Sequence, residues 1–262
     1  RLALAASPAK VLNLALSDVI GDSLDVIASG PFTADSSTFE DAWAVVERYS
    51  LEDKIPVSVG RFLKLGLSGN EAETPKIGDR RVDSVVNCIV GSNRKSLEAA
   101  ARRAIELGYE PVILTSTLSG EARDAARFLA AIAKESLAYG DPAPPPVSFI
   151  AGGETTVTVR GPGKGGRNQE MALAFSLLIE GAEGVAMLSG GTDGRDGPTD
   201  AAGGAVDGTT AARARALGLD PRAALEENDS YNLLDGAGAL VKTGPTRTNV
   251  MDVQVILLAP NR

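Results

Sequence analysis

The chain contains no histidine and only one cysteine among its 262 residues. The absence of histidine excludes Ser-His-Asp and Cys-His nucleophile systems, histidine general bases and histidine zinc sites. A single cysteine forms no internal disulfide, and Cys88 lies in the apolar run 85–90. We therefore expect it to be a small buried core residue of a cytoplasmic protein. The chemistry that remains belongs to carboxylates, lysine, arginine, backbone amides and hard metal ions.

The chain is also poor in positive charge and in long apolar segments. Its net charge is −8 and its isoelectric point is about 4.8. Nucleic acids and anionic membranes are bound by basic surfaces, so we expect neither as a partner. No apolar run approaches the ~20 residues that cross a bilayer. The hydrophobic fraction of 44% instead predicts one or two globular domains with sizeable cores.

Apolar periodicity and turn residues divide the first third of the chain into short elements. A strand is expected at 11–16. The segment Ser37–Glu40 has the spacing of a capping box and predicts a helix that ends at about Tyr49. Pro56 can occupy the first turn of a further short helix. The stretch Gly66–Gly78 is polar and aperiodic, so we expect a domain boundary there.

Beyond that boundary strands and helices alternate regularly, which is typical of an α/β fold with a largely parallel sheet. Thr and Val alternate along 155–160, and this segment with 147–151 predicts a hairpin, which would make the sheet mixed. The expected strands are 85–90, 111–115, 147–151, 155–160, 185–189 and 252–258. The expected helices are 93–107, 121–137, 169–179 and 209–217.

A glycine-rich stretch joins the last strand of that hairpin to the next helix. It reads Gly161-Pro162-Gly163-Lys164-Gly165-Gly166-Arg167-Asn168. Glycines let the backbone approach a ligand closely, and a turn before a helix presents free amides, an arrangement that binds anions. Lys164 adds charge, and Arg167 can hold a phosphate or a carboxylate through two bonds. The stretch is neither a Walker A loop nor a Rossmann fingerprint. The alternative is a flexible turn with a surface arginine.

A second stretch follows the expected strand 185–189 and is rich in aspartate. It reads Thr192-Asp193-Gly194-Arg195-Asp196-Gly197-Pro198-Thr199-Asp200. Ligands of parallel sheets lie at the carboxyl ends of the strands. Clustered carboxylates there can hold Mg²⁺ against nucleotide phosphates, with Asp193, Asp196 and Asp200 as ligands. One of them can instead orient or deprotonate a hydroxyl. The alternative is a solvated Asp/Gly turn.

Two weaker candidates also follow expected strands. Ser17 and Asp18 come directly after one strand, and Ser92 and Asn93 follow another and open a helix. Ser92 can bind an anion through its amide and hydroxyl, although a helix N-cap is at least as good an explanation. Asp18 can equally satisfy loop amides.

These motifs make the chain similar to a known family. It resembles class II glycerate kinase (glycerate 2-kinase), some members of which carry the name hydroxypyruvate reductase. Its C-terminal part resembles the MOFRL domain of that family. The motifs that carry the resemblance extend over nearly the whole chain. They are Leu16–Val19, Gly21-Asp22, Val26–Pro31, Gly91–Asn93, Gly152–Val157, Gly165–Glu170, Gly191–Gly194, Asp196–Gly203 and Thr243–Thr246.

The resemblance implies two α/β domains with the active site in the cleft between them. Residues 1–78 would be the C-terminal portion of a Rossmann-like N-terminal kinase domain that is only partly present. Residues 79–262 would form a three-layer α/β domain with a mixed sheet, and its MOFRL motifs would span about 147–259. Because family members are longer, the resemblance also implies that the chain is incomplete at its N-terminus.

The implied activity is ATP-dependent phosphorylation of D-glycerate to 2-phosphoglycerate with Mg²⁺. The enzyme would be cytoplasmic, and a homo-oligomer is one option for its assembly. Carried over by motif, the catalytic candidates are Arg167 and Asp193. The substrate- and phosphate-binding candidates are Lys164, Gly165, Gly166, Asn168, Ser92, Asn93, Ser17, Asp18 and Thr192.

Three departures and two alternatives accompany this resemblance. Arg247 stands where the family has glycine, Asn232 stands where many relatives have histidine, and Arg195 stands where the residue is usually uncharged. One alternative is an NAD(P)H-dependent hydroxypyruvate reductase, which the missing Gly-x-Gly-x-x-Gly fingerprint disfavours. The other is a non-catalytic module that binds an anion or a sugar acid.

Overall fold

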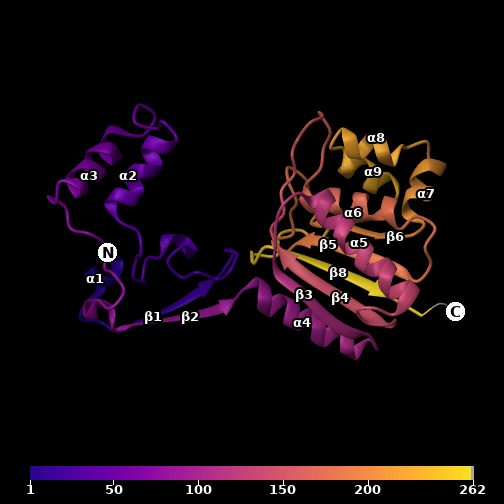
Figure 1. The fold of residues 1–262 in the computed structure, drawn as a ribbon, viewed down its shortest axis with the longest axis horizontal. Coiled ribbons are helices and arrows are strands. Elements are labelled where there is room, and N and C mark those ends of the chain that lie inside the picture. Colours follow the sequence, from indigo (N-terminus) through magenta and orange to yellow (C-terminus); the bar gives the residue numbers. More distant parts are fainter. Residues whose placement is uncertain (261–262) are drawn as a thin grey trace. The chain divides into compact units, whose positions relative to one another are not determined.

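The computed structural model describes residues 1–260 (Figure 1). The chain forms two compact units. One contains Arg1–Ala15 and Ser23–Val90, and the other contains Leu16–Asp22 together with the chain from Gly91 onward. The sequence predicts domains at 1–78 and 79–262. Those limits come from the resemblance to a family, and a division into compact units does not test them, so they stay a prediction.

The first unit is the smaller one and combines short helices with a two-stranded sheet. Its strands β1 (Val11–Leu16) and β2 (Val85–Gly91) form a two-stranded sheet. They run in the same direction, since the amide of Val11 donates to Ser84 and the amide of Ser17 donates to Gly91. The helices are α1 (Leu2–Ala6), α2 (Phe39–Arg48) and α3 (Val57–Leu67), with 3-10 turns η1 (Ile27–Ser29) and η2 (Arg80–Val82).

The helix α2 is where the sequence predicts it, but its capping box lies one residue later. Thr38 Oγ1 accepts the amide of Asp41 at 3.2 Å, and Asp41 Oδ2 accepts the amide of Thr38 at 2.9 Å. Ser37 is unavailable because its amide and hydroxyl both donate to Asp35. The prediction of a Ser37–Glu40 box is therefore wrong in register, although the spacing rule holds.

The single cysteine is exposed, not buried. Cys88 lies on the same face of β2 as Val86 and Val90, which are 60% and 48% exposed. Leucines at alternate positions of β1 are exposed to a similar extent. An apolar run shows that a strand forms, but it does not show whether another layer covers both of its faces. The prediction of a buried Cys88 is wrong for that reason.

The second unit is built on a six-stranded sheet of order β3-β4-β8-β5-β6-β7. Its strands are β3 (Glu110–Leu118), β4 (Val147–Gly153), β5 (Val185–Gly191), β6 (Gly203–Asp207), β7 (Leu240–Val241) and β8 (Asp252–Leu258). Only β3 and β4 pair in parallel, and the other four pairings are antiparallel. The expected mixed sheet is confirmed, whereas the expected predominance of parallel pairing is wrong. The reason is that β8, yellow in Figure 1, enters between β4 and β5 in the opposite direction.

The predicted hairpin between 147–151 and 155–160 does not form. Both edges of β4 are already taken, one by β3 and the other by β8. Residues 155–160 therefore leave the sheet and run as an extended segment, with a single bridge between Thr156 and Glu121. Alternating Thr and Val describe a local preference, and the competition for edges of the sheet overrides it.

Helices cover both faces of the sheet at β3 and β4. Helix α4 (Asn93–Glu106) packs on one face, and α5 (Ala122–Tyr139) and α6 (Arg167–Leu178) lie on the other (Figure 1). Every residue of β4 is buried, as expected for the middle of three layers. The short helices α7 (Thr210–Ala216), α8 (Pro221–Glu226) and α9 (Ser230–Gly236) pack against α6, so Asn168–Ser176 is buried on all sides. In the described part of the chain no helix is long and apolar enough to cross a bilayer.

Candidate functional site

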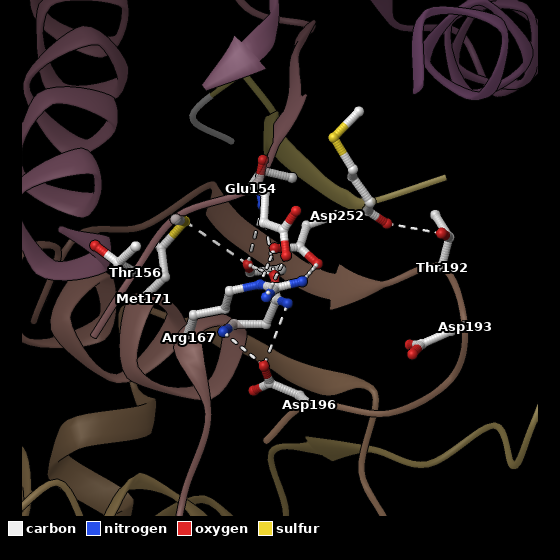
Figure 2. Close-up of polar contacts among 12 residues, drawn as sticks. Glu154, Thr156, Arg167, Met171, Thr192, Asp193, Asp196 and Asp252 are labelled. Carbon is white, nitrogen blue, oxygen red and sulfur yellow. Dashed lines mark hydrogen bonds and ion pairs between the residues drawn. The ribbon is translucent and has the colours of Figure 1, made fainter. Parts of the chain in front are cut away.

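The carboxyl ends of β4 and β5 flank the beginning of β8. In the register of the sheet, Gly153 of β4 and Gly191 of β5 both lie opposite Asp252, the first residue of β8. The start of α6 carries Arg167 to the same place (Figure 2). The segments that the sequence marks as rich in glycine and aspartate thus converge within the second unit.

Arg167 is held by two carboxylates at this point (Figure 2). Its Nε and Nη2 donate to the two carboxylate oxygens of Asp252 at 2.6 and 3.0 Å, and its Nη1 donates to Glu154 Oε1 at 2.8 Å. Asp252 is 1% exposed. Burial acts to lower the pKa of Arg167, but the hydrogen bonds and charge of Asp252, with the charge of Glu154, outweigh it and raise that pKa. Arg167 is therefore a fixed, permanently charged group.

Arg167 faces a cleft of about 720 Å³. Glu154 and the buried carboxylate of Asp196 line it as well, and Ile20 reaches it from the loop after β1. The remaining lining is the extended segment 155–159, glycines of the two glycine-rich stretches, Pro198, Glu170 and Asn228. Both sides of this cleft come from the second unit. It combines apolar walls with a few charged groups, as small-molecule sites do.

The amino terminus of α6 already has an anion. The carboxylate of Asp196 accepts the amides of Asn168 and Gln169 at 3.1 and 2.8 Å, and Gln169 Nε2 at 2.9 Å. A Cβ on Gly166 would lie 2.4 Å from the carboxyl carbon of Asp196, so only glycine allows this approach. Burial raises the pKa of Asp196, and the amide hydrogen bonds act against that rise. A ligand anion at this helix end would have to displace Asp196.

The glycines before α6 serve a close contact within the protein. A Cβ on Gly161 would lie 2.4 Å from Glu227 Cα, and one on Gly163 would lie 2.4 Å from Glu227 O. Hydrogen bonds also join this segment to the loop between α8 and α9. Lys164 Nζ lies 4.0 Å from the centre of the Tyr231 ring. The sequence correctly marks a place of close approach, but much of that approach is to the α8–α9 loop.

Comparisons with known proteins agree with this arrangement. A model of the MOFRL family matches residues 147–252, and a domain of unknown function, DUF4147, matches residues 1–64. A glycerate kinase of Macaca fascicularis is 38% identical over 305 residues, covering 99% of this chain and 75% of the relative. The chain belongs to the glycerate kinase family.

Other members of the family are closer in sequence. The D-glycerate 2-kinase of Thermotoga maritima is 49% identical over 251 residues, which are 96% of this chain and 57% of the relative. The crystal structure of a glycerate kinase from the same organism superposes with a TM-score of 0.88 at 48% identity, covering 99% of this chain and 59% of that one. A putative hydroxypyruvate reductase of Agrobacterium vitis is 42% identical, over 98% of this chain and 57% of the relative. The chain thus spans little more than half the length of several relatives.

In this glycerate kinase family member, Asn168 faces the sheet. Its Oδ1 accepts the hydroxyl of Ser189 at 2.6 Å and the amide of Gln254 at 3.4 Å, and all three residues are buried. These bonds tie α6 to β5 and β8, so they fix the height of Arg167 above the sheet. A role for Asn168 in contact with substrate stays a prediction, whereas its hydrogen bonds support a positioning role.

Thr192 and Asp193 lie on the loop after β5. Thr192 Oγ1 donates to Met251 O at 2.7 Å and accepts the amide of Val250 at 2.9 Å. Asp193 Oδ1 accepts the amide of Arg195 at 2.9 Å. Figure 2 shows Asp193 apart from the Arg167 side chain and its two carboxylates, with no interaction drawn to it. The Thr192 side chain is thus used to brace the chain just before Asp252.

The three aspartates of the proposed Mg²⁺ site have separate partners. Asp196 caps α6, and Asp193 closes its own turn. Asp200 accepts Tyr231 Oη at 2.6 Å and pairs with Lys242 at 3.3 Å, and the hydrogen bond from Tyr231 lowers its pKa. Among the described residues no group of three or more potential ligands is placed to hold a metal ion. These side chains therefore do not fit a Mg²⁺ centre built from protein carboxylates.

Of the weaker candidates near strand ends, Asn93 has clear structural partners. Asn93 Nδ2 donates to the carbonyls of Val250 and Asp252 at 2.9 and 2.8 Å, which ties the start of α4 to β8. Ser92 is the N-cap residue of α4, although its side chain makes no capping bond. Ser17 is buried, and Asp18 beside it is exposed.

Sequence reasoning missed Glu154 and Asp252, which hold Arg167. Glu154 lies inside the motif Gly152–Val157 that carries the family resemblance, so a signal for it was present. Asp252 follows Met251, a buried residue with φ of 68°. A left-handed methionine is unusual, and such geometry concentrates at functional sites. No pattern in the sequence reveals it, because the conformation depends on the tertiary fold.

Proposed function

We propose that this chain belongs to a D-glycerate 2-kinase, which transfers the γ-phosphoryl group of ATP to the 2-hydroxyl of D-glycerate and forms 2-phosphoglycerate. The observation that carries the proposal is 49% identity to the D-glycerate 2-kinase of Thermotoga maritima over 96% of the chain. That relative is considerably longer, so activity of these 262 residues by themselves is a separate question. A cytoplasmic location and a homo-oligomer are further parts of the proposal.

The cleft has properties that suit phosphoryl transfer. This reaction needs positioned reactants and neutralised charge more than covalent chemistry, and the chain has no histidine for the latter. Arg167 supplies a fixed positive charge because buried Asp252 grips it on one edge. Asp193 is proposed to orient or deprotonate the acceptor hydroxyl. Asp193, Asp196 and Asp200 do not come together as a metal site among the described residues.

The other candidates are proposed to form the wall around the reactants. Gly165 and Gly166 line the cleft, and Lys164 lies beside them in the chain. The proposed substrate- or phosphate-binding residues also include Ser17, Asp18, Ser92, Asn93, Asn168 and Thr192. Several of these side chains form hydrogen bonds with backbone atoms, which supports indirect roles in which they hold the loops in place.

The proposal is tested by a chimera. These residues replace the matching portion of the Thermotoga enzyme, and ADP release is measured with D-glycerate, with L-glycerate and without acceptor. D-glycerate-dependent turnover close to that of the parent enzyme is expected. Turnover that does not depend on glycerate, or no turnover from a folded chimera that binds ATP, would contradict the proposal. The 262-residue chain is assayed in parallel.

Two alternatives are distinguished by the same preparation. The relatives named putative hydroxypyruvate reductase motivate an arm with NADH and hydroxypyruvate, in which loss of NADH absorbance would favour a reductase. A non-catalytic binding module would bind glycerate in the chimera without any turnover. In that case Arg167→Ala would weaken binding and leave no activity to lose.

A further inference from the structure

The two carboxylates that hold Arg167 are not equivalent. Asp252 is 1% exposed and uses both oxygens, one on Nε and one on Nη2. Glu154 has a side chain that is 45% exposed and uses one oxygen on Nη1. The first is a buried, bidentate pair and the second is a single bond at the surface of the cleft. Only the second can be exchanged for a ligand without opening the core.

The guanidinium of Arg167 can still donate hydrogen bonds on its outer side. Arginine has five N–H donors in a fixed fork. Within the described residues Asp252 and Glu154 accept three of them. The outer edge consists of one N–H of Nη1 and one N–H of Nη2, and it matches a carboxylate that binds through both oxygens. Glu154 takes Nη1 through a single oxygen, and the second N–H of Nη2 has no acceptor among the described residues. Glu154 therefore occupies the edge incompletely, and a bidentate ligand would hold it better.

A second group beside Arg167 also lacks a partner. Thr155 follows Glu154 in the chain, lines the same cleft and is 3% exposed. Its hydroxyl has no hydrogen-bond partner among the described residues. Buried hydroxyls are nearly always bonded, and an unpaired one is destabilising. The oxygen itself is covered, so a ligand hydroxyl could bond to it only after displacement of the neighbouring Glu154 side chain exposes it.

The charge of the cleft favours a ligand with one negative charge. Three carboxyl groups line it, those of Glu154, Glu170 and Asp196, and Arg167 is the charged group that opposes them. Outside the lining, Asp252 pairs with Arg167 and Arg123 pairs with Glu170, so the group as a whole carries more carboxylates than arginines. A phosphate brings up to two charges into this negative surrounding and is repelled more strongly. Exchange of Glu154 for one ligand carboxylate leaves the total unchanged.

We infer that Glu154 is an internal stand-in for the carboxylate of the ligand, and that a hydroxy acid binds by displacing it from the outer edge of Arg167 while its hydroxyl meets Thr155. This inference rests on the proposed function and deepens it, since it assigns Arg167 to the carboxylate of the acceptor and not to a phosphate. Glu154 would then tune affinity by competing with the substrate.

The size of the effect follows from that competition. An exposed ion pair shifts an equilibrium only modestly, so the closed arrangement is populated about one to five times as much as the open one. Ligand affinity falls by the fraction that is open. Removal of the competing charge in Glu154→Gln is therefore expected to tighten carboxylate binding about two- to sixfold.

Binding is measured by calorimetry on the 262-residue chain with four ligands: D-glycerate, propionate, glycerol and inorganic phosphate. Glu154→Gln is expected to tighten D-glycerate and propionate, to leave glycerol unchanged, and to leave phosphate weaker than either carboxylate. Thr155→Val is expected to reduce the preference for D-glycerate over propionate. The control is Glu183→Gln, which removes an exposed charge before the opposite end of β5 and should change nothing.

Several results would overturn the inference. Weaker or unchanged carboxylate binding by Glu154→Gln would show that Glu154 assists the ligand or does not compete with it. Tighter binding of glycerol would show a general opening of the cleft. Phosphate that binds more tightly than D-glycerate would reverse the assignment of Arg167. Failure of the proposed function is distinguishable, because the 262-residue chain can show the carboxylate-selective gain in binding even if the chimera has no kinase activity.

Discussion

Replacement of Asp196 by asparagine tests whether this carboxylate is the anion that completes α6. The carboxylate accepts two backbone amides and one side-chain amide at 2.8 to 3.1 Å. Asparagine has the same shape but one acceptor oxygen, so whichever way it turns, at least one buried amide loses its partner. That loss costs about 1–3 kcal/mol. Loss of the charge at the helix end costs about 0.3–1 kcal/mol more, and relief of a buried charge offsets part of the total.

We expect Asp196→Asn to lower the free energy of unfolding by about 2 kcal/mol, which corresponds to a fall in Tm of about 4–8 °C. Urea and thermal denaturation of the chain measure both quantities. Asp200→Asn is the matched control, because Asp200 makes exposed contacts worth about 0–1 kcal/mol. If Asp196→Asn equals or exceeds the stability of the original chain, burial of the charge outweighs its hydrogen bonds. The reasoning about the occupied helix end would then fail.

The pH dependence of the same difference gives a second check. Burial raises the folded-state pKa of Asp196 above 3.8, so the folded chain holds this proton more tightly than the unfolded chain. The stability contributed by that proton is present below 3.8 and is lost as pH rises through the folded pKa. The free energy of unfolding of the original chain should therefore exceed that of Asp196→Asn by less and less from pH 4 towards neutrality. An advantage that grows over this range would show that the amide hydrogen bonds dominate.

Three other substitutions test separate parts of the structure. Gly163→Ala places a Cβ 2.4 Å from Glu227 O and should cost about 1–3 kcal/mol in urea denaturation, whereas Gly60→Ala meets only a 3.6 Å contact in α3 and should not destabilise. Arg247→Gly relieves an exposed left-handed residue with φ of 65° and should stabilise by about 0.5–1 kcal/mol, while Arg247→Ala keeps the strain and should not. Arg167→Ala should lower kcat/KM of the chimera about 30-fold or more, corresponding to about 2 kcal/mol of lost charge stabilisation, and unchanged kinetics would remove Arg167 from the catalytic role.

Local sequence patterns predicted most elements correctly, and their failures share a cause. The strand predicted at 252–258 is β8 to the residue, and the strand predicted at 11–16 is β1. The segment 155–160 has an equally clear strand pattern but finds no free edge beside β4. Periodicity depends on near neighbours in the chain, whereas pairing depends on which distant strands have already filled the sheet.

The site was predictable in location but not in its pairings. The two stretches do lie together, since Gly166 lies against Asp196 and Gly197 lies against Gly165. The second follows β5 as predicted, whereas the strand predicted before the first, 155–160, does not form. Asp196 was expected as a metal ligand, and its carboxylate instead caps α6. Residue type shows that a carboxylate can accept strong donors. It does not show whether those donors are amides or a metal ion, because that depends on what the fold places within 3 Å.

The sequence by itself determined the excluded chemistry, the local elements and the motifs of the family. These depend on composition and on residues a few positions apart, and the missing histidine has the same meaning in any fold. Only the tertiary structure decided that Arg167 pairs with Asp252, 85 residues further along the chain, and that the glycines approach the α8–α9 loop. Such contacts arise because β8 enters the sheet between β4 and β5 and brings its first residue to the start of α6. That placement is a property of the whole sheet, and no short pattern of residues contains it.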